Sequence, residues 1–359
     1  MSIHFHKIKV KDVKRETPEC VSVLFDVPPE LQKEFAFRQG QSLTMRAFLG
    51  GEEVRRTYSI CSSPLENEWR VAIKKVDGGL FSGFANNDLM RGDELEVMPP
   101  VGKFYTELNP SAKKKYLAFA AGSGITPVIS IIKTTLQTEP HSEFTLVFGN
   151  RSRPSIIFFE ELEALKNKHM DRFNLIHVLS RERTETALNS GRMDEQKLDT
   201  LEKLVDYGEM DEIFICGPET MIFCIRDYME RKGVDRKQIH FELFTTPGVK
   251  TNTVRKRETV KEGGPTGTII MKIDGRTIEF PLSLQSETTL LDAALQQGAD
   301  LPYACKGGVC CTCKAKLLEG EVSMDVHWGL EEEEIEKGFI LTCQSHPKTE
   351  KVVVDFDVK

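Results

Sequence analysis

The chain has 359 residues, of which 29% are charged and 40% hydrophobic, and its formal net charge is −7. This composition is typical of a globular protein with two or three domains, and the negative charge argues against a general nucleic-acid-binding surface. Residues 1–6 lack the apolar region of a secretory signal, and the most apolar stretch, residues 116–132, is broken by glycine, threonine and proline. We therefore expect a cytoplasmic protein that neither spans a membrane nor binds nucleic acid, and its nine cysteines suit that reducing compartment.

Residues 1–106 have the pattern of an antiparallel β-barrel. Short alternating runs such as residues 21–25 and 69–73 recur between turns that contain Gly-Gly or Gly-Asp. Short strands at regular spacing, joined by tight turns, are typical of barrels.

Two motifs lie within this β-rich region. The first, Arg-Thr-Tyr-Ser at residues 56–59, supplies an arginine that can bind a phosphate, a tyrosine that can stack on a flat ring, and a hydroxyl. The second, at residues 79–87, places Ser82 at a helix start after a glycine turn, which makes an anion site from backbone N–H groups. A solvated edge strand is the alternative for the first motif alone. The two motifs together, ahead of a nucleotide-type domain, favour a binding site.

Residues 107–248 have the alternating pattern of a parallel α/β sheet. The apolar run 116–121 indicates a buried strand, and residues 122–127, Gly-Ser-Gly-Ile-Thr-Pro, lead into a helix predicted over 128–136. A strand, a glycine turn and a helix N-terminus form a cradle for a diphosphate, here as G-x-G-x-x-P rather than the G-x-G-x-x-G of the Rossmann fingerprint. Further strands and helices are predicted over 144–148, 158–166, 173–179, 212–215, 219–232 and 240–244.

Polar residues follow the predicted strands at the edge of the sheet where ligands bind. Ser180 and Arg181 are candidates to hold a 2′-phosphate, and an ordinary surface arginine is the alternative. Cys216, in the Cys-Gly-Pro of residues 216–218, is a candidate to lie against a nicotinamide ring, or else a small core residue. Glu242 is either a polar group near the reacting rings or an exposed strand residue.

Residues 249–265 are polar and basic and end in Gly-Gly-Pro, which indicates a linker that spans on the order of 20–25 Å as a flexible coil. Residues 266–359 then begin with the pattern of a β-hairpin that has Asp274 and Gly275 at its turn. Helices are predicted over 289–297 and over 330–337. The second is acidic and is interpreted as a solvated face, with a docking patch as the alternative.

The last region contains a cysteine pattern that predicts an iron–sulfur centre. Three cysteines have the C-x4-C-x2-C spacing and a fourth follows at a distance, which is the spacing of a plant-type [2Fe–2S] centre. A zinc site usually has two C-x2-C pairs, of which the loop has one, and a disulfide framework is disfavoured without a secretory signal. The predicted metal ligands are Cys305, Cys310, Cys313 and Cys343.

The cluster loop also contains residues that are not ligands. Gly307 and Gly308 let the chain wrap tightly, because glycine adopts positive φ without steric cost. Cys311 lies inside the motif but off the ligand positions, so we expect it to be a small packed thiol.

Taken in chain order, the motifs resemble those of the ferredoxin–NADP reductase superfamily. The cysteine pattern narrows the resemblance to the flavin–NAD–ferredoxin reductases that feed oxygenases. Residues 178–182 and 305–310 are, in addition, similar to the reductases of phenylacetyl-CoA epoxidase systems. The motifs that carry the wider resemblance are at residues 56–59, 79–82, 122–127 and 216–218.

The resemblance implies a fold, cofactors and roles for individual residues. The cofactors are FAD, with FMN as the alternative, a [2Fe–2S] cluster, and NADPH or NADH. The catalytic residues are Ser59 near the flavin N5, Cys216 near the hydride-transfer point, and Glu242. The implied domains are an N-terminal antiparallel β-barrel flavin domain over 1–106, a parallel α/β NAD(P)-binding domain over 107–248, a linker over 249–265 and a C-terminal β-grasp [2Fe–2S] ferredoxin domain over 266–359. The implied cofactor-binding residues are Arg56, Thr57, Tyr58, Ser59, Gly79 and Ser82 for the flavin, and Gly122, Gly124, Thr126, Ser180, Arg181, Cys216, Gly217 and Pro218 for the nucleotide.

Electron counting gives the route that these cofactors imply. NAD(P)H gives two electrons together as hydride, a [2Fe–2S] cluster accepts one, and a flavin can take two and release them singly. The predicted enzyme is therefore an NAD(P)H:acceptor oxidoreductase that serves a multicomponent oxygenase, such as a phenylacetyl-CoA 1,2-epoxidase. A different ring-hydroxylating oxygenase or a hybrid-cluster protein is the alternative acceptor. An electron-carrier module without NAD(P)H activity is the alternative class, and the cradle at residues 122–127 argues against it.

Overall fold

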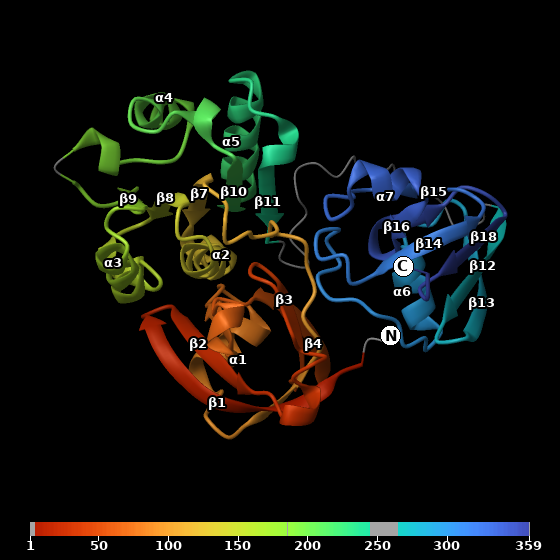
Figure 1. The fold of residues 1–359 in the computed structure, drawn as a ribbon. Coiled ribbons are helices and arrows are strands. Elements are labelled where there is room, and N and C mark those ends of the chain that lie inside the picture. Colours follow the sequence, from red (N-terminus) through yellow and green to blue (C-terminus); the bar gives the residue numbers. More distant parts are fainter. Residues whose placement is uncertain (1–3, 185, 245–264, 359) are drawn as a thin grey trace. The chain divides into compact units, whose positions relative to one another are not determined.

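The computed structural model describes residues 4–184, 186–244 and 265–358, and these form two compact units. One unit runs from Phe5 to Phe244 and contains two sheets, and the other contains residues 265–358 (Figure 1). The predicted linker lies outside the described residues except for its last position, Pro265. No helix in the described part of the chain is both long enough and apolar enough to cross a bilayer.

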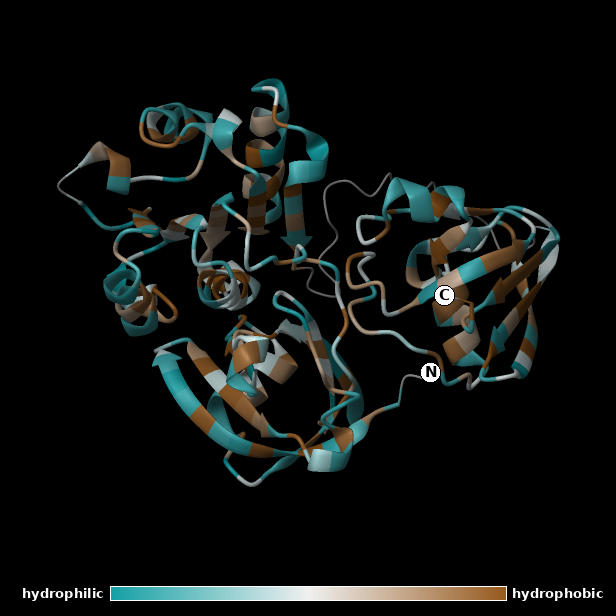
Figure 2. Cartoon of the chain, in the orientation of Figure 1, coloured by the Kyte–Doolittle hydropathy of each residue, from teal (hydrophilic) through white to brown (hydrophobic). Residues whose placement is uncertain are grey.

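The first sheet is the predicted antiparallel barrel. Its six strands are hydrogen-bonded in the order β4-β3-β6-β1-β2-β5, and a bridge between Ile60, which follows β4, and Val71 of β5 helps to close the sheet on itself. Figure 2 shows hydrophobic and hydrophilic residues alternating along β1, as a half-buried strand requires. The elements are β1 His6–Thr17, β2 Cys20–Asp26, β3 Ser42–Leu49, β4 Glu52–Ser59, β5 Trp69–Lys74 and β6 Glu94–Val97, with short 3-10 helices η1 Pro29–Leu31 and η2 Pro64–Glu66.

Helix α1, Leu80–Asn87, packs against strands β2 to β5 of the barrel. Phe81 and Ala85 of this helix belong to the barrel core. The Asn86 side-chain amide donates hydrogen bonds to the Ile73 carbonyl at 3.0 Å and, within the helix, to the Ser82 carbonyl at 2.9 Å. Apolar and polar contacts therefore both fix the position of the glycine turn that starts this helix.

The second sheet is the predicted parallel α/β sheet. Its strands have the order β11-β10-β7-β8-β9, and every neighbouring pair is parallel. Figure 1 shows α2 and α3 on one face of the sheet and α4 and α5 on the other. Strands β8 and β9 lie on one side of β7, and β10 and β11 lie on the other, so right-handed connections place the two pairs of helices on opposite faces. The strand order reverses between β7 and β10, so ligands are expected at the carboxyl ends of these two strands. The elements are β7 Lys115–Ala121, η3 Gly122–Gly124, α2 Ile125–Thr138, β8 Glu143–Asn150, η4 Arg153–Ser155, α3 Phe159–Lys168, β9 Phe173–Leu179, η5 Ala187–Asn189, α4 Glu195–Glu202, η6 Tyr207–Glu209, β10 Glu212–Gly217, α5 Glu219–Arg231, η7 Arg236–Gln238 and β11 Ile239–Leu243.

Helix α2 begins at Ile125, three residues before the start predicted from the apolar pattern. The glycine loop itself forms the 3-10 turn η3, which leads directly into the helix, and the apolar run is only the buried middle of α2. Pro127 therefore lies in the first helical turn, where its missing N–H costs no intrahelical hydrogen bond.

The C-terminal unit has the mixed sheet of the predicted β-grasp fold. Its strand order is β13-β12-β18-β14-β16, in which β12 and β18 are parallel and the other pairs antiparallel. The predicted hairpin is present, and its turn residues Asp274 and Gly275 have φ angles of 49° and 70°, as a type I′ turn requires. The elements are β12 Thr266–Ile273, β13 Arg276–Ser283, α6 Leu290–Gln296, β14 Lys314–Glu319, β15 Val322–Met324, α7 Glu332–Glu336, β16 Phe339–Leu341, η8 Thr342–Gln344, β17 Ser345–Pro347 and β18 Lys351–Asp355.

Candidate functional site

The two barrel motifs, which are separate in sequence, meet in the structure. Arg-Thr-Tyr-Ser forms the end of β4, and the Tyr58 ring lies 5.7 Å from the Phe81 ring of α1, centroid to centroid. Burial raises the pKa of the Tyr58 hydroxyl well above its usual value, so this side chain is a neutral aromatic surface. The Thr57 and Thr44 hydroxyl oxygens are 3.0 Å apart, and the Arg56 guanidinium donates to the Arg55 carbonyl at 2.7 Å.

The glycine turn before α1 is tightly packed. A Cβ added to Gly79 would stand 2.5 Å from the Ser82 hydroxyl oxygen, so no side chain fits there without movement. The Ser82 hydroxyl accepts a hydrogen bond from the Val76 N–H at 3.1 Å and donates to the Gly79 carbonyl at 3.3 Å. Ser82 thus shapes the turn, and the N-terminus of α1 presents backbone N–H groups of the kind that hold a diphosphate.

The second glycine cradle leads into α2. Gly122 has a φ of 55°, and a Cβ added to Gly124 would stand 2.1 Å from the Cys216 carbonyl oxygen. Gly124 therefore allows the start of α2 to approach the carboxyl end of β10. The Thr126 hydroxyl donates to the Ser123 carbonyl at 3.0 Å, which holds the loop in place. The loop can accept a nucleotide diphosphate, because it combines a close backbone approach with a helix N-terminus.

Three residues predicted as catalytic lie at the point where the two sheets face each other. Cys216 is fully buried and is the register partner of Glu242 on β11. The Ser59 hydroxyl donates to the Glu242 carboxylate at 3.1 Å. Burial raises the pKa of Glu242 to about 7, and the Ser59 hydrogen bond works in the opposite direction. Burial also raises the pKa of Cys216, so its thiol is neutral.

The residues after β10 have mainly structural contacts. A Cβ added to Gly217 would stand 2.6 Å from the Met221 methyl group and 3.1 Å from the Ala121 Cβ, so a larger residue would require the Met221 side chain to move. Pro218 has an extended backbone and is the N-cap residue of α5. These two residues therefore give the strand-to-helix turn its shape.

Ser180 and Arg181 follow β9 at the same edge of the sheet, and both are exposed. The Ser180 N–H donates to the Asn150 carbonyl at 2.9 Å, and the Arg181 N–H donates to the Arg151 carbonyl at 2.8 Å. Their backbone thus continues the pairing of β9 with the segment after β8. Arg181 is thus exposed at the carboxyl edge of the sheet.

Sequence reasoning missed Lys74, the last residue of β5. Its ammonium nitrogen lies 3.8 Å from the position of a Cβ on Gly122, so a barrel lysine stands beside the glycine loop of the other sheet. The local pattern could not reveal this, because it shows two adjacent lysines at a strand end. The contact between Lys74 and the glycine loop depends on how the two sheets of this unit pack against each other.

The four predicted cluster cysteines form two pairs. The Cys305 thiol is close enough to Cys310, and the Cys313 thiol close enough to Cys343, for each partner to shift its pKa. The contact with Cys310, together with backbone N–H groups, lowers the pKa of Cys305 to about 6 although burial opposes the shift. No group of three or more metal-binding side chains in the described chain surrounds a single point. Two pairs fit a [2Fe–2S] cluster, because each iron takes two cysteines.

The cluster loop reaches its shape differently from the prediction. Gly308 has a φ of 75°, and a Cβ on it would stand 2.7 Å from the Val326 side chain, but Gly307 does not have a positive φ. The other left-handed residues of the loop are Lys306 and Cys311, with φ angles of 51° and 55°. Lys306 is held by an ion pair with Asp292 at 2.7 Å, and the Cys311 thiol donates to the Gly329 carbonyl. Tertiary contacts therefore stabilise a conformation that glycine would adopt without them.

Comparisons with known proteins agree with this architecture. Residues 7–105 match the oxidoreductase FAD-binding domain, residues 119–227 the oxidoreductase NAD-binding domain, and residues 271–348 the 2Fe-2S iron-sulfur cluster binding domain. The sequence is 46% identical over 356 residues to one of the subunits of the 1,2-phenylacetyl-CoA epoxidase of Escherichia coli K12, covering 99% of this chain and 98% of that protein. It is 34% identical over 358 residues to the ferredoxin reductase component of the 3-ketosteroid-9-alpha-monooxygenase of Rhodococcus rhodochrous, covering 97% and 96%.

A solved structure has a similar fold over nearly the whole chain. Phthalate dioxygenase reductase, whose structure is described as modular for electron transfer from pyridine nucleotides to [2Fe-2S], covers 98% of both chains with a TM-score of 0.59 and 22% identity. At this identity the likeness supports the fold alone.

The fold and the sites define an electron-transfer flavoprotein with an iron–sulfur domain. The chain belongs to the family of FAD- and [2Fe–2S]-containing ferredoxin reductases that are components of oxygenases. It is an oxidoreductase that takes electrons from NAD(P)H and delivers them, by way of its flavin and cluster, to an acceptor protein. The predictions of FAD, a [2Fe–2S] cluster and NAD(P)H are thereby confirmed.

Proposed function

We propose that this chain is the reductase component of a phenylacetyl-CoA 1,2-epoxidase. The observation that carries the proposal is the 46% identity to one of the polypeptides of that enzyme, an identity that spans 99% of this chain. The identity is higher than the 34% to the 3-ketosteroid monooxygenase reductase, which matches this chain over a similar length. The sequence also contains no Glu-x-x-His pair of the kind that di-iron helical bundles use, so we assign the oxygen chemistry to separate subunits.

The flavin site supports a defined role for each barrel residue. When bound, the flavin supplies the exchange between hydride and single electrons. Tyr58 offers an apolar ring face for it, Arg56 a cation for its phosphate, and the α1 N-terminus at Gly79 backbone donors. Ser59 and Glu242 hold a hydroxyl and a carboxyl side by side where the two sheets meet, and the carboxyl, with its pKa of about 7, can hold or release a proton near neutral pH.

The nucleotide site has two proposed cationic contacts. We assign Lys74, together with the backbone of Gly122 and Gly124, to the diphosphate, because its ammonium group lies beside that loop. Ser180 and Arg181 lie after β9, where we assign them to a 2′-phosphate, which makes NADPH the preferred donor. Cys216 supplies a small neutral surface beside Glu242.

Reconstitution tests the proposal. The protein with intact flavin and cluster is mixed with NADPH, epoxidase oxygenase subunits and phenylacetyl-CoA, and the epoxide is followed by mass spectrometry. We expect NADPH oxidation that depends on phenylacetyl-CoA and decreases as salt screens the docking of the two proteins. The matched control is Cys343→Ser, which should still reduce ferricyanide but form no epoxide. An intact protein that reduces ferricyanide but supports no epoxidation would disprove the epoxidase assignment and leave the family assignment unchanged.

A further inference from the structure

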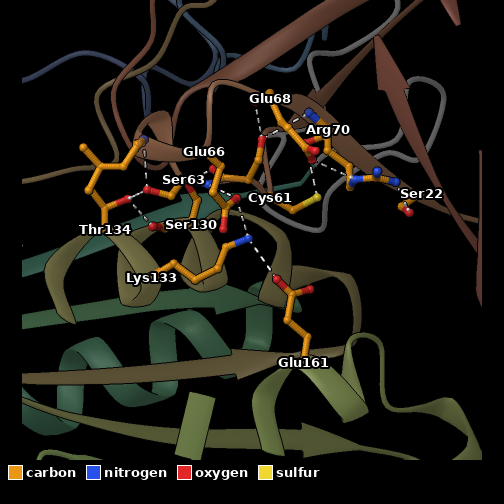
Figure 3. Close-up of polar contacts among 12 residues, drawn as sticks. Ser22, Cys61, Ser63, Glu66, Glu68, Arg70, Ser130, Lys133, Thr134 and Glu161 are labelled. Atoms are coloured by element: carbon orange, nitrogen blue, oxygen red, sulfur yellow. Dashed lines mark hydrogen bonds and ion pairs between the residues drawn. The ribbon is translucent and has the colours of Figure 1, made fainter. Parts of the chain in front are cut away.

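Lys133 connects the barrel and the nucleotide-binding domain of the Phe5–Phe244 unit at a point outside the reaction site. It lies in the middle of α2 and only 6% of its surface is exposed. Its ammonium nitrogen is 2.9 Å from a carboxylate oxygen of Glu66 and 2.9 Å from one of Glu161 (Figure 3). Glu66 belongs to η2 of the barrel and Glu161 to α3 of the nucleotide-binding domain. One buried cation therefore binds both domains.

Two hydroxyl groups on the same helix reinforce this contact. The Thr134 and Ser63 hydroxyl oxygens are 2.9 Å apart (Figure 3). The Ser130 hydroxyl donates a hydrogen bond to the Ser62 carbonyl at 2.6 Å. All the barrel partners lie in residues 62–66. The Glu66 carboxylate also accepts the Ser63 N–H at 2.8 Å, so this segment is held by its own capping box. Side chains of α2 thus bind residues 62–66, whose conformation is stabilised by the capping box.

The charges explain why the contact is specific. Burial lowers the pKa of the Lys133 ammonium group, but Glu161 and Glu66 raise it by more, so the lysine remains charged. Removing one partner of such a group leaves a desolvated charge without compensation, which destabilises the arrangement that buried it. The two ion pairs of Lys133 therefore stabilise the contact between the two domains.

The contact lies close to both halves of the reaction site. Residues 62–66 follow the Arg-Thr-Tyr-Ser motif after only two residues, Ile60 and Cys61. Lys133 is seven residues after Thr126 in the same helix, or roughly 10 Å along its axis. We propose that Lys133 is a positioning residue, which sets the distance between the flavin platform on β4 and the dinucleotide cradle at the start of α2.

This role has a direct consequence for the reaction. Efficient transfer between two bound reactants requires the reacting atoms to lie within about 3–3.5 Å, and a displacement of about 1 Å can lower the rate a hundredfold. Lys133 touches neither cofactor site, so its loss should change the geometry of the reactants more than their binding.

The test uses the full-length protein with both cofactors and the variant Lys133→Met. Stopped-flow measurement of flavin reduction should show the limiting rate at saturating NADPH lowered roughly ten- to a hundredfold, with little change in the dissociation constant of NADPH. Hydrogen–deuterium exchange provides a readout that does not depend on activity. Peptides that cover residues 62–66 and α2 should exchange faster in the variant, and Lys133→Arg should restore much of the rate and the protection.

Arg172→Met is the matched control. The Arg172 guanidinium donates to the carbonyls of Leu136, Glu139 and Ser142, so it ties the other end of α2 within the nucleotide-binding domain and touches no barrel residue in these bonds. We expect lower thermal stability in this variant with an unchanged limiting rate of flavin reduction.

Two outcomes would overturn the proposal. The first is a folded Lys133→Met protein with the wild-type limiting rate. The second is an equal loss of rate in Arg172→Met, because general loosening of α2 would then explain both. If Lys133→Met does not retain flavin, Glu66→Gln replaces it, since glutamine can keep the cap on Ser63 while losing the charge. A wild-type limiting rate in Glu66→Gln would likewise overturn the proposal.

Discussion

The Ser59 hydroxyl donates a hydrogen bond to the Glu242 carboxylate at 3.1 Å, although 183 positions separate the two residues in the chain. Ser59 ends a barrel strand and Glu242 lies on the edge strand of the parallel sheet. Each domain thus contributes one polar group to the same point. The protonation of Glu242 therefore depends on the contact between the two domains.

The pH dependence of stability should reveal Glu242. Its pKa is about 7 in the folded flavin-free protein and near the ordinary value of 4.5 in the unfolded chain, so the folded state holds the extra proton between these pH values. The free energy of unfolding should therefore fall as pH rises from about 4.5 to about 7. Glu242→Gln cannot ionise and should lack this part of the fall. Urea unfolding of both flavin-free proteins at several pH values measures the free energy of unfolding. The same dependence on pH in the two proteins would contradict the raised pKa of Glu242.

Lys74→Met should weaken the binding of both nicotinamide nucleotides. Loss of a charge-assisted phosphate contact costs about 1.5–3 kcal/mol, or roughly ten- to a hundredfold in affinity. NADPH and NADH share the diphosphate, so both dissociation constants should rise together. The control is Lys75→Met, because Lys75 is the exposed neighbour and contacts the Asn87 side chain instead. An effect on NADPH alone would assign Lys74 to a different phosphate.

Arg181→Ala should separate the two nucleotides. If its side chain binds the 2′-phosphate, the Michaelis constant for NADPH should rise by roughly ten- to a hundredfold, from the same cost of about 1.5–3 kcal/mol. The constant for NADH, which lacks that group, should barely change. Steady-state ferricyanide reduction with each donor measures both values, and equal changes would remove Arg181 from the 2′-phosphate site.

Serine replacement of single cysteines should identify the cluster ligands. Changing Cys305, Cys310, Cys313 or Cys343 should abolish the visible spectrum of the [2Fe–2S] centre, while the flavin stays bound and ferricyanide is still reduced by NAD(P)H. Cys311→Ser should keep the cluster, because its thiol contacts the Gly329 carbonyl instead. Absorption spectra with iron and flavin analysis provide the measurement. A cluster that survives Cys343→Ser, or is lost in Cys311→Ser, would show that the ligands were assigned wrongly.

The sequence predicted those features whose cause is local. Two such features are the spacing of Cys305, Cys310 and Cys313 and the Gly-Ser-Gly loop after β7. Each is a short sequence pattern, because one local loop must supply all the side chains or backbone groups of the site. The barrel, the parallel sheet and the hairpin at Asp274 and Gly275 followed from alternation and turn residues in the same way, whereas the β-grasp fold was implied only by the family resemblance. The helix start at Ile125 was predicted too late, because a glycine loop has no apolar periodicity to reveal that it is already helical.

Contacts between residues that only the tertiary fold brings together could not be predicted. Lys133 and Glu66 are 67 positions apart, and nothing in either local sequence indicates the other. The same holds for Lys74 beside Gly122. Cysteine spacing predicted the ligand set but not its division into the pairs Cys305–Cys310 and Cys313–Cys343, because that division depends on how the loop folds back onto η8.

The C-terminal unit has its own hydrophobic core, whose buried residues run from Ile269 to Val354 and include Cys313 and Cys343. All four proposed cluster ligands belong to this unit. This unit therefore supplies all four proposed ligands of the redox centre. Recombination that exchanges the gene segment for this unit could then change the acceptor protein, while the segment that encodes the nucleotide-oxidising domains is inherited unchanged. A chimaera that carries residues 266–359 of a different oxygenase reductase should keep its rate of flavin reduction by NADPH and serve the other oxygenase.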